Sequence, residues 1–284
     1  MLPFTQVDVF TAEFMLGNPV AVVHDADGLD DVTMAAFARW TNLSETTFLL
    51  APTDPAADYR LRIFTTAREL PFAGHPTLGS ARAWLAHHQS KSGAGVVQEC
   101  GAGLVTVRTD GDRLAFAAPP LRRGGPVAAA DIAEVVAAVG ADPADVLGAQ
   151  WADNGPGWVA LLLSSAAAVL ALEPDRARFG RFRDIGVVGA HPAGSEVAVE
   201  VRAFLADAGV AEDPVTGSLN AALGQWLIPA GQLPESYVAA QGTRLGRRGR
   251  VHVSRVDGQV WVGGDTVIGV SGQVSLPRAR PARK

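Results

Sequence analysis

The sequence carries an internal repeat. A run of the form Pro-x-x-Gly-Ser occurs at residues 76–80 and again at 214–218, 138 residues later in a chain of 284. An Arg-x-Phe triplet precedes each run, and each copy ends in Trp-Leu, at 84–85 and 226–227. Further along, each copy alternates apolar residues around an Asp-Gly pair, which is typical of a β-hairpin. Two ordered matches at similar offsets indicate a duplicated unit of strand, loop, helix and hairpin.

This repeat predicts an α+β fold with two pseudo-symmetric lobes, each wrapping a sheet around one main helix. Pro and Gly cluster at 119–126, so we expect an N-terminal lobe at 1–120 and a C-terminal lobe at 121–284, with end strands able to cross between the lobes. The basic, proline-punctuated tail 277–284 is expected to be frayed. We expect a pseudo-two-fold rotation to superimpose the two Pro-x-x-Gly-Ser runs, with both helix starts facing one cleft.

Local patterns give further expectations. Strands at 7–10 and 21–24 are expected to flank a turn at Gly17-Asn18-Pro19. Helical spacing over 33–40 predicts a helix with Asp31 at its start, and 46–50 reads as a strand. We expect Thr77 and Thr216 to cap the repeated helices, and Trp84 and Trp226 to be equivalent core residues.

Composition narrows the function. The formal net charge is −5, which disfavours nucleic acid as a partner. Cys100 is the one cysteine, so a disulfide within the chain is excluded and a reducing cytoplasm is favoured. The six histidines lack the spacing of a metal site. The N-terminus does not resemble a signal peptide, and the longest apolar stretch, 158–172, is too short to span a bilayer, so we expect a soluble protein without membrane contact.

The repeated helix entries are candidates for binding a small anion, because a helix start presents unpaired N–H groups and a partial positive charge. Glycine at such a start lets a ligand approach the backbone, and a carboxylate-bearing substrate would be held at Gly217 and Ser218. The first copy carries His75 where the second carries Asp213, and this asymmetry is what an acid–base site needs. The alternative is a pair of capped helices at a domain boundary.

Glu45 is the third candidate. It lies between a predicted helix and a buried-looking strand, where partial loss of water would raise the pKa of its carboxyl towards that of a useful general base. The alternative is an ordinary surface glutamate at the start of a strand.

At these residues the sequence resembles the PhzF-like family of phenazine biosynthesis. The segments that carry the resemblance are 7–11, 17–22, 42–46, 74–79, 212–218, 241–242 and 247–253. The run Glu-Asp-Pro-Val-Thr-Gly-Ser at 212–218 is the most specific of them, and together they span nearly the whole chain.

The resemblance implies a fold like that of diaminopimelate epimerase, with a barrel-like sheet around a central helix in each lobe. It implies an isomerase with no metal and no organic cofactor, in which Glu45 relays a proton between two carbons of a small acidic substrate. It places the neighbouring His, Asp and Ser of the family site at His75, Asp213 and Ser218. Gly74, next to His75, is a further candidate for binding the substrate or an anion. It also implies a homodimer.

Departures from the family pattern fall in the same segments. They are Ala73 for the common Cys, Pro76 after Gly-His, and Leu219-Asn220 after Gly-Ser. These changes leave the natural substrate open. Two other functions also stay open: an amino-acid-type racemase or epimerase, and a small-molecule binding protein that has lost its chemistry.

Overall fold

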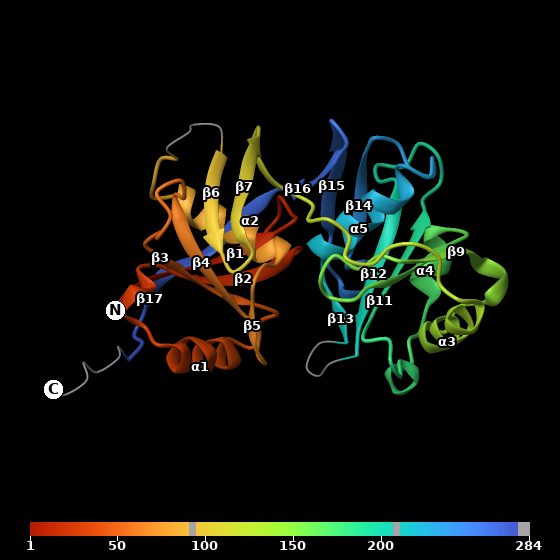
Figure 1. Ribbon diagram of the computed structural model, residues 1–284, viewed down its shortest axis with the longest axis horizontal. Helices are drawn as coiled ribbons and strands as arrows, with labels where there is room; N and C mark the ends of the chain where they lie inside the picture. Colours follow the sequence, from red (N-terminus) through yellow and green to blue (C-terminus); the bar gives the residue numbers. More distant parts are fainter. Residues whose placement is uncertain (91–94, 207–210, 278–284) are drawn as a thin grey trace. The chain divides into compact units, whose positions relative to one another are not determined.

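The computed structural model describes residues 1–90, 95–206 and 211–277, and the chain divides into two compact units (Figure 1). The first comprises Met1–Phe116 together with Gly264–Lys284, and the second Ala117–Gly263. The C-terminal strand β17 (Thr266–Val274) belongs to the first unit because it pairs antiparallel with β1 (Leu2–Val9). The sequence analysis assigned this segment to the second lobe while allowing end strands to cross. Residues 278–284 of the expected frayed tail lie outside the described residues.

The first unit is built on a mixed sheet with the pairing order β17-β1-β2-β3-β4-β6-β7-β8. All neighbours are antiparallel except β2–β3 and β4–β6, and the short β5 pairs with β4. The further strands are β2 (Asn18–Val23), β3 (Thr46–Leu50), β4 (Tyr59–Phe64), β5 (Glu69–Leu70), β6 (Gly95–Cys100), β7 (Gly103–Asp110) and β8 (Arg113–Ala117). Helix α1 (Asp31–Thr41) connects β2 to β3, and α2 (Gly74–Leu85) connects β5 to β6.

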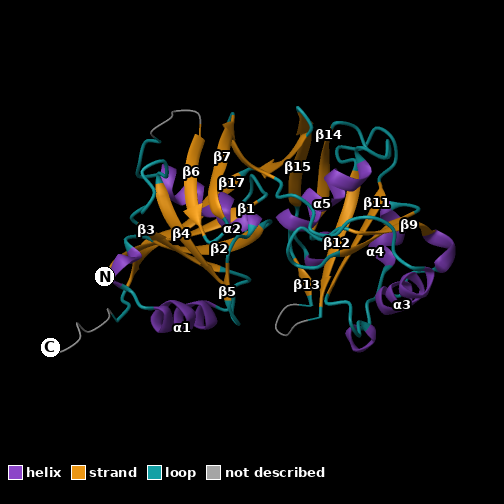
Figure 2. Ribbon diagram, in the orientation of Figure 1, coloured by secondary structure: helices purple, strands orange, loops and turns teal. Residues whose placement is uncertain are grey.

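The second unit has a sheet with the order β9-β10-β11-β12-β14-β15-β16, in which β10–β11 and β12–β14 are parallel and β13 pairs with β12. Its strands are β9 (Val146–Trp151), β10 (Val159–Leu163), β11 (Asp184–Ala190), β12 (Val199–Leu205), β13 (Glu212–Asp213), β14 (Ser236–Gln241), β15 (Gly249–Val256) and β16 (Gln259–Gly264). Its helices are α3 (Ala129–Val139), α4 (Ala166–Ala171) and α5 (Gly217–Leu227). Figure 2 shows how strands predominate over helices within each unit.

Each pairing from β1 to β8 has a counterpart from β9 to β16, with the same parallel or antiparallel sense. Helix α2 occupies the place in the first unit that α5 occupies in the second. The repeat seen in the sequence is therefore present in the strand pairings.

The register of the repeat differs from the expected one. The central helices begin at Gly74 and Gly217, which are 143 residues apart, whereas the Pro-x-x-Gly-Ser runs are 138 apart. Residues 76–80 consequently lie inside α2, while 214–218 straddle the start of α5. Thr77 is an interior residue of α2, not a cap, and Thr216 occupies the N-cap position of α5 without a capping bond from its side chain.

The same shift separates the two tryptophans. Counted from the helix starts, Trp84 corresponds to Leu227, and Trp84 and Trp226 are half-buried, so their expected equivalence in the core is wrong.

Of three local expectations, one is corrected and two are confirmed. Asn18 and Pro19 open strand β2 and pair with β1, so the turn expected there lies earlier in the chain. Helix α1 is capped by Asp30, whose carboxylate accepts the Thr33 N–H, and Asp31 is the first helical residue. The strand expected at 46–50 is confirmed as β3.

The second hairpin turns as expected at Asp257-Gly258. The φ angles of 50° and 79° are the left-handed pair of a type I′ turn. The first hairpin turns one residue later than the Asp-Gly pair, between Asp110 and Arg113.

Helix α2 packs against β1, β2, β3, β4, β6, β7 and β17 of its unit, and nearly all of residues 74–83 are buried. Close packing requires glycine at position 79, where a Cβ atom would lie 2.3 Å from Val20 Cγ1.

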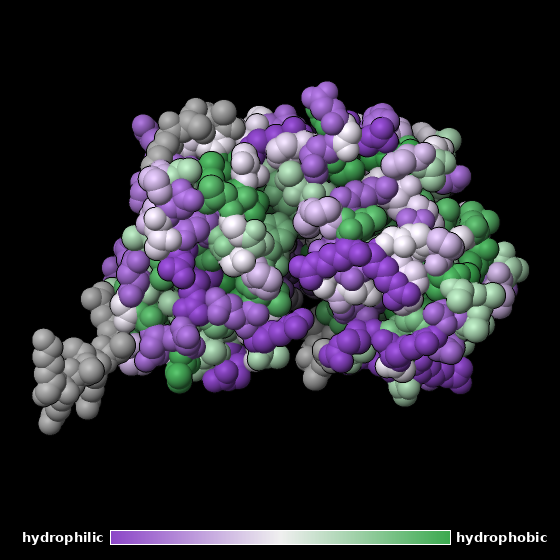
Figure 3. All heavy atoms as spheres, viewed as in Figure 1, coloured by the Kyte–Doolittle hydropathy of each residue, from purple (hydrophilic) through white to green (hydrophobic). Residues whose placement is uncertain are grey.

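On the visible surface, hydrophilic and apolar residues are interspersed in both units (Figure 3). Among the described helices, none combines the length and apolar character needed to cross a membrane.

Candidate functional site

Glu45 and His75 lie together in the first unit. Glu45 precedes β3 directly, and His75 is the second residue of α2. The Nε2 atom of His75 lies 3.4 Å from Oε2 of Glu45, and the two side chains are 6% and 15% exposed. The fold therefore brings together two candidates that are 30 positions apart in the sequence, in surroundings from which most water is excluded.

His75 is electrically neutral at physiological pH. Burial lowers the pKa of its imidazole from 6.5 to about 3, and a hydrogen bond with the backbone of Pro19 opposes this shift only partly. A neutral imidazole carries one N–H donor and one acceptor nitrogen. The contact with Glu45 therefore joins a neutral ring and a carboxyl group, and it is not an ion pair.

Asn18 is a neighbour of His75 that the sequence analysis did not select. Its Nδ2 atom lies 3.5 Å from Nδ1 of His75, and the side chain is buried. The adjacent Gly17 N–H donates to the carboxylate of Asp8 at 3.1 Å, and a Cβ at Gly17 would lie 2.2 Å from the Val9 carbonyl oxygen. The Gly-Asn pair is thus fixed by close packing and by a buried carboxylate, and it places an amide beside the histidine.

In the second unit, Asp213 and the start of α5 share a hydrogen-bond network centred on Gln241. The Thr216 hydroxyl donates to Oδ2 of Asp213 at 2.7 Å. The Gln241 amide donates to that hydroxyl at 2.9 Å and to the Asp213 carbonyl at 3.2 Å, while its oxygen accepts from the Thr216 N–H and from Asn220. Gln241 is completely buried, and it fixes the backbone on which the candidate anion site is built.

Ser218, the second residue of α5, accepts hydrogen bonds from two residues of the segment that leads from β9 to β10. The Trp158 indole N–H donates to its hydroxyl at 3.0 Å, and the Asn154 amide donates to its carbonyl at 2.8 Å. Gly217 and Ser218 are the first two residues of the helix, so their N–H groups have no acceptor within the helix. This part of the site can bind an anion through backbone N–H groups.

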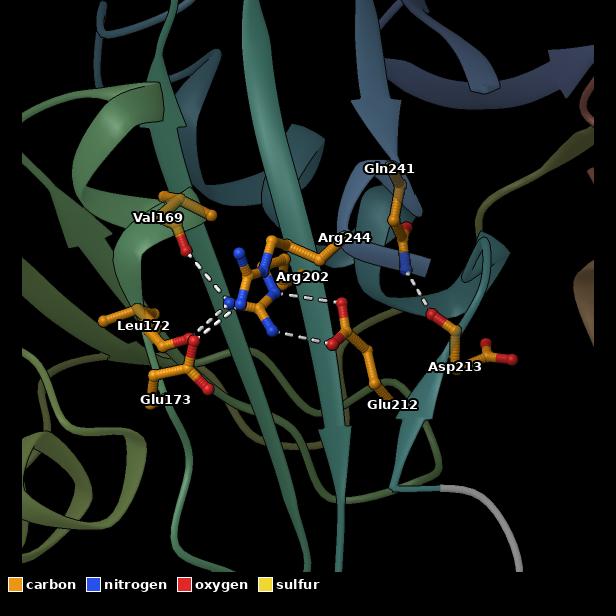
Figure 4. Close-up of polar contacts among 8 residues, drawn as sticks. All are labelled: Val169, Leu172, Glu173, Arg202, Glu212, Asp213, Gln241 and Arg244. Atoms are coloured by element: carbon orange, nitrogen blue, oxygen red, sulfur yellow. Dashed lines mark hydrogen bonds and ion pairs between the residues drawn. The ribbon is translucent and has the colours of Figure 1, made fainter. Parts of the chain in front are cut away.

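Strand β13, which carries Asp213, is anchored by a buried ion pair (Figure 4). Arg202 donates from Nε and Nη2 to the two carboxylate oxygens of Glu212, at 3.0 and 2.8 Å, and the two side chains are 5% and 8% exposed. Its Nη1 donates to the carbonyls of Val169 and Leu172 at the end of α4. This bidentate geometry fixes Glu212, and with it the position of its neighbour Asp213.

The equivalence expected between His75 and Asp213 is not what the fold shows. In the strand pairings Asp213 opposes Ala203 as Leu70 opposes Ile63, so Leu70 is the counterpart of Asp213. The counterpart of His75, counted from the helix starts, is Ser218. The two copies therefore differ at two structural positions, Leu70 against Asp213 and His75 against Ser218, and not at the single position expected from the sequence.

The sequence analysis missed Asn18, Asn154, Trp158 and Gln241. For Asn18 and Gln241 the available signal was an uncharged polar residue next to an apolar run, which needs a buried hydrogen-bond partner. In residues 1–90, 95–206 and 211–277 no group of three His, Cys, Asp or Glu side chains has a spacing that fits a metal ion.

Comparison with known proteins identifies the family. The phenazine biosynthesis-like protein family matches residues 7–272. A curated relative, the trans-2,3-dihydro-3-hydroxyanthranilate isomerase of Pseudomonas aeruginosa, is 34% identical over 90% of each chain. The protein called antisense-enhancing sequence 1 of Schizosaccharomyces pombe is 38% identical over 95% of this chain and 97% of its own.

Among solved structures, a predicted epimerase from Pseudomonas aeruginosa superimposes with a TM-score of 0.79 at 26% identity, covering 96% of this chain and 99% of its own. The mixed α/β fold described above is shared with that protein. The chain therefore belongs to the phenazine biosynthesis-like protein family and is an isomerase of that family.

Proposed function

We propose that this isomerase moves a proton on a small carboxylate-bearing substrate by general acid–base catalysis, without a metal or organic cofactor, and that Glu45 carries the proton. The observation that carries the proposal is the contact between the mostly buried Glu45 carboxyl and the neutral, buried His75. A carboxylate in such surroundings is a stronger base than one in water.

In the proposed reaction Glu45 accepts a proton from one carbon, and the electron pair of the broken C–H bond moves into the adjacent π system. The resulting carboxylic acid then returns the proton to another carbon, so atoms and charge balance and the net change is isomerisation. The neutral ring of His75 lies beside Glu45, with Asn18 on its Nδ1 side. Burial against this uncharged ring excludes water from the Glu45 carboxyl and thereby favours uptake of a proton by it.

The start of α5 is proposed to bind the carboxylate of the substrate through the N–H groups of Gly217 and Ser218. Gly74, at the corresponding start of α2, is proposed to let a ligand approach the backbone in the same way. Asp213 is proposed to orient the substrate, and its hydrogen bond from Thr216 restricts its side chain.

Glu45→Gln tests the proton-carrier role. It preserves shape but removes the base, so turnover should fall by at least about a hundredfold while ligand binding changes little. We would measure carbon-bound deuterium by NMR in deuterated water, first with trans-2,3-dihydro-3-hydroxyanthranilate, the substrate in the name of a relative, and then with cyclic and amino-acid carboxylates.

The matched control is Glu235→Gln, which removes a carboxylate that is 66% exposed and should leave turnover unchanged. If Glu45→Gln retains wild-type turnover on a verified substrate, Glu45 is not the base. Asp213→Asn should cost less than Glu45→Gln, because an amide keeps an oxygen that can accept the Thr216 hydrogen bond.

Epimerisation at a carbon next to a carboxylate is the second candidate, favoured by the likeness to the predicted epimerase. The deuterium experiment separates the two reactions, because epimerisation exchanges a proton without moving a double bond.

Three further statements remain predictions from the sequence and the family: barrel-like, pseudo-symmetric lobes, a homodimer and a cytoplasmic location. The matching strand pairings support the first of these.

A further inference from the structure

Gln241, the last residue of β14, makes four hydrogen bonds through a completely buried side chain. Its amide nitrogen donates to the Asp213 carbonyl (Figure 4) and to the Thr216 hydroxyl, at 3.2 and 2.9 Å. Its amide oxygen accepts from the Thr216 N–H at 3.0 Å and from the Asn220 amide at 2.9 Å. Both donor hydrogens and both lone pairs of the amide are therefore in use.

Two backbone groups fix the orientation of this amide. A backbone carbonyl can only accept a hydrogen bond, and a backbone N–H can only donate one. The Asp213 carbonyl therefore requires the amide nitrogen of Gln241, and the Thr216 N–H requires its oxygen. Exchange of the two atoms would place acceptor against acceptor and donor against donor in a buried site, which is costly.

The orientation of the amide determines where the single hydrogen of the Thr216 hydroxyl points. The amide nitrogen has only hydrogens to offer, so the hydroxyl oxygen accepts at that contact. The hydrogen of the hydroxyl is then left for the acceptor on the other side, Oδ2 of Asp213, at 2.7 Å. A chain of donors consequently runs from Gln241 through Thr216 to the Asp213 carboxylate.

The same arrangement leaves the start of α5 uncapped. Thr216 occupies the N-cap position, where a threonine hydroxyl ordinarily accepts from the N–H of the second or third helical residue. Here the side chain makes no capping bond. The second helical residue is Ser218, whose N–H is proposed above to bind the substrate carboxylate. A capping hydroxyl would compete with the substrate for that N–H.

We propose that Gln241 is a positioning residue for the isomerase reaction, because it directs the Thr216 hydroxyl to Asp213 and keeps it away from the Ser218 N–H. One buried amide thereby sets both the carboxylate proposed to orient the substrate and the N–H proposed to bind it. The inference about the reaction rests on the proposed function, whereas the direction of the hydroxyl does not.

Neutron diffraction from a crystal of the full chain, exchanged into heavy water, tests the direction of the hydroxyl without a substrate. We expect the deuteron on Oγ1 of Thr216 to lie towards Oδ2 of Asp213. We also expect both amide deuterons of Gln241 on the atom that faces the Asp213 carbonyl. A Thr216 deuteron that points away from Asp213 would overturn the proposal, whether or not Glu45 carries the proton.

Thr216→Val tests the effect on the reaction, because it keeps the shape of the side chain and the N–H that Gln241 accepts. In the deuterium assay, turnover should fall roughly tenfold, the equivalent of one hydrogen bond. The Michaelis constant should stay unchanged, since no hydroxyl is left to compete for the Ser218 N–H. Thr216→Ser should restore turnover, and Thr243→Val, at an exposed threonine of the same unit, is the matched control.

Gln241→Leu removes the amide and allows the Thr216 hydroxyl to cap the helix. Turnover should fall, and the Michaelis constant should rise roughly tenfold because the Ser218 N–H is then occupied. Addition of Thr216→Val to Gln241→Leu should return the Michaelis constant towards the wild-type value, since the competing hydroxyl is removed. General damage to the fold would instead make the double variant worse than the single one.

A double-mutant cycle separates this inference from the proposed function. If the hydroxyl acts through Asp213, Thr216→Val should have no further effect on turnover in an Asp213→Ala background. Additive effects, or wild-type turnover in Thr216→Val while Asp213→Ala is impaired, would overturn the inference alone. Wild-type turnover in Asp213→Ala would overturn both the inference and the proposed role of Asp213. Wild-type turnover in Glu45→Gln would overturn only the assignment of the proton carrier.

Discussion

The two units use the same ion pair at equivalent strands but in opposite surroundings. Arg62 of β4 binds Glu69 of β5 through Nε and Nη2, both at 2.7 Å, as Arg202 of β12 binds Glu212 of β13. The Arg62 and Glu69 side chains are 17% and 42% exposed, against 5% and 8% in the second unit. The comparison shows that one local pattern gives a surface contact in one copy and a buried anchor in the other.

The central helices differ in the same manner. Both begin with a glycine, but the next residue is His75 in α2 and Ser218 in α5. Each is contacted by an asparagine that follows the first strand of its unit, Asn18 beside the His75 ring and Asn154 on the Ser218 carbonyl. An asparagine therefore contacts the second residue of the central helix in both units. That second residue is His75, beside the candidate base, in the first unit and Ser218, at the candidate anion site, in the second.

The largest expected effect concerns the buried pair. Glu212→Gln leaves Arg202 without a counter-charge in a buried site, so the free energy of unfolding should fall by about 3–5 kcal/mol. Urea unfolding at pH 7 measures this change, provided that the slope with denaturant stays constant. A loss below about 1 kcal/mol would mean that burial does not distinguish the two pairs.

Acid should destabilise the first unit before the second. Burial lowers the pKa of His75 to about 3, and burial, followed by the charge of His87, lowers that of His24 to about 4. In the unfolded chain both take up a proton near pH 6.5, whereas the folded chain keeps them neutral. Stability is therefore complete above about pH 6.5 and falls as the pH drops towards 3–4, by up to about 1.4 kcal/mol per pH unit for each group.

Amide hydrogen exchange at pH 7 and pH 5 locates this effect, with protection expected to fall first in residues 1–116. His24→Gln should flatten the dependence of stability on pH, and His252→Gln in the second unit is the matched control. Equal loss of protection in both units would contradict the prediction.

A smaller effect is expected at the start of α5. Ser218→Ala removes the acceptor of the Trp158 indole N–H, so the backbone that is proposed to bind the carboxylate loses one support. The Michaelis constant should rise roughly tenfold, the equivalent of one hydrogen bond, with a lesser change in turnover. Ser195→Ala, at an exposed serine, should change neither constant. A fall in turnover alone would indicate that Ser218 acts in the chemical step.

The smallest effect is expected at the exposed pair. Glu69→Gln should lower the free energy of unfolding by less than about 1 kcal/mol, because solvent screens the pair and Arg62 keeps Asp31 as a partner at 2.6 Å. The same urea experiment measures it beside Glu212→Gln. Equal losses in the two variants would remove the distinction between the copies.

The sequence by itself determined the local elements and most of the candidates. Period-two alternation predicted the second hairpin, because side chains alternate across a sheet whatever its surroundings, and the buried-looking run at 46–50 predicted strand β3. Glu45 and His75 were selected from motif residues, and the structure brings them to 3.4 Å. Their contact, however, depends on β3 and α2 packing together, which no local pattern specifies.

Tertiary structure alone decided the register of the repeat and which of its charged side chains are buried. Helix α2 begins at Gly74, ahead of the repeated run. Residues that are aligned by the sequence repeat therefore do not occupy equivalent positions in the two helices. Arg62 and Arg202 occupy similar local sequences, yet only Arg202 is covered, because α4 places the carbonyls of Val169 and Leu172 against it. Burial is set by distant segments of the chain, and burial decides which of these charges is a structural anchor.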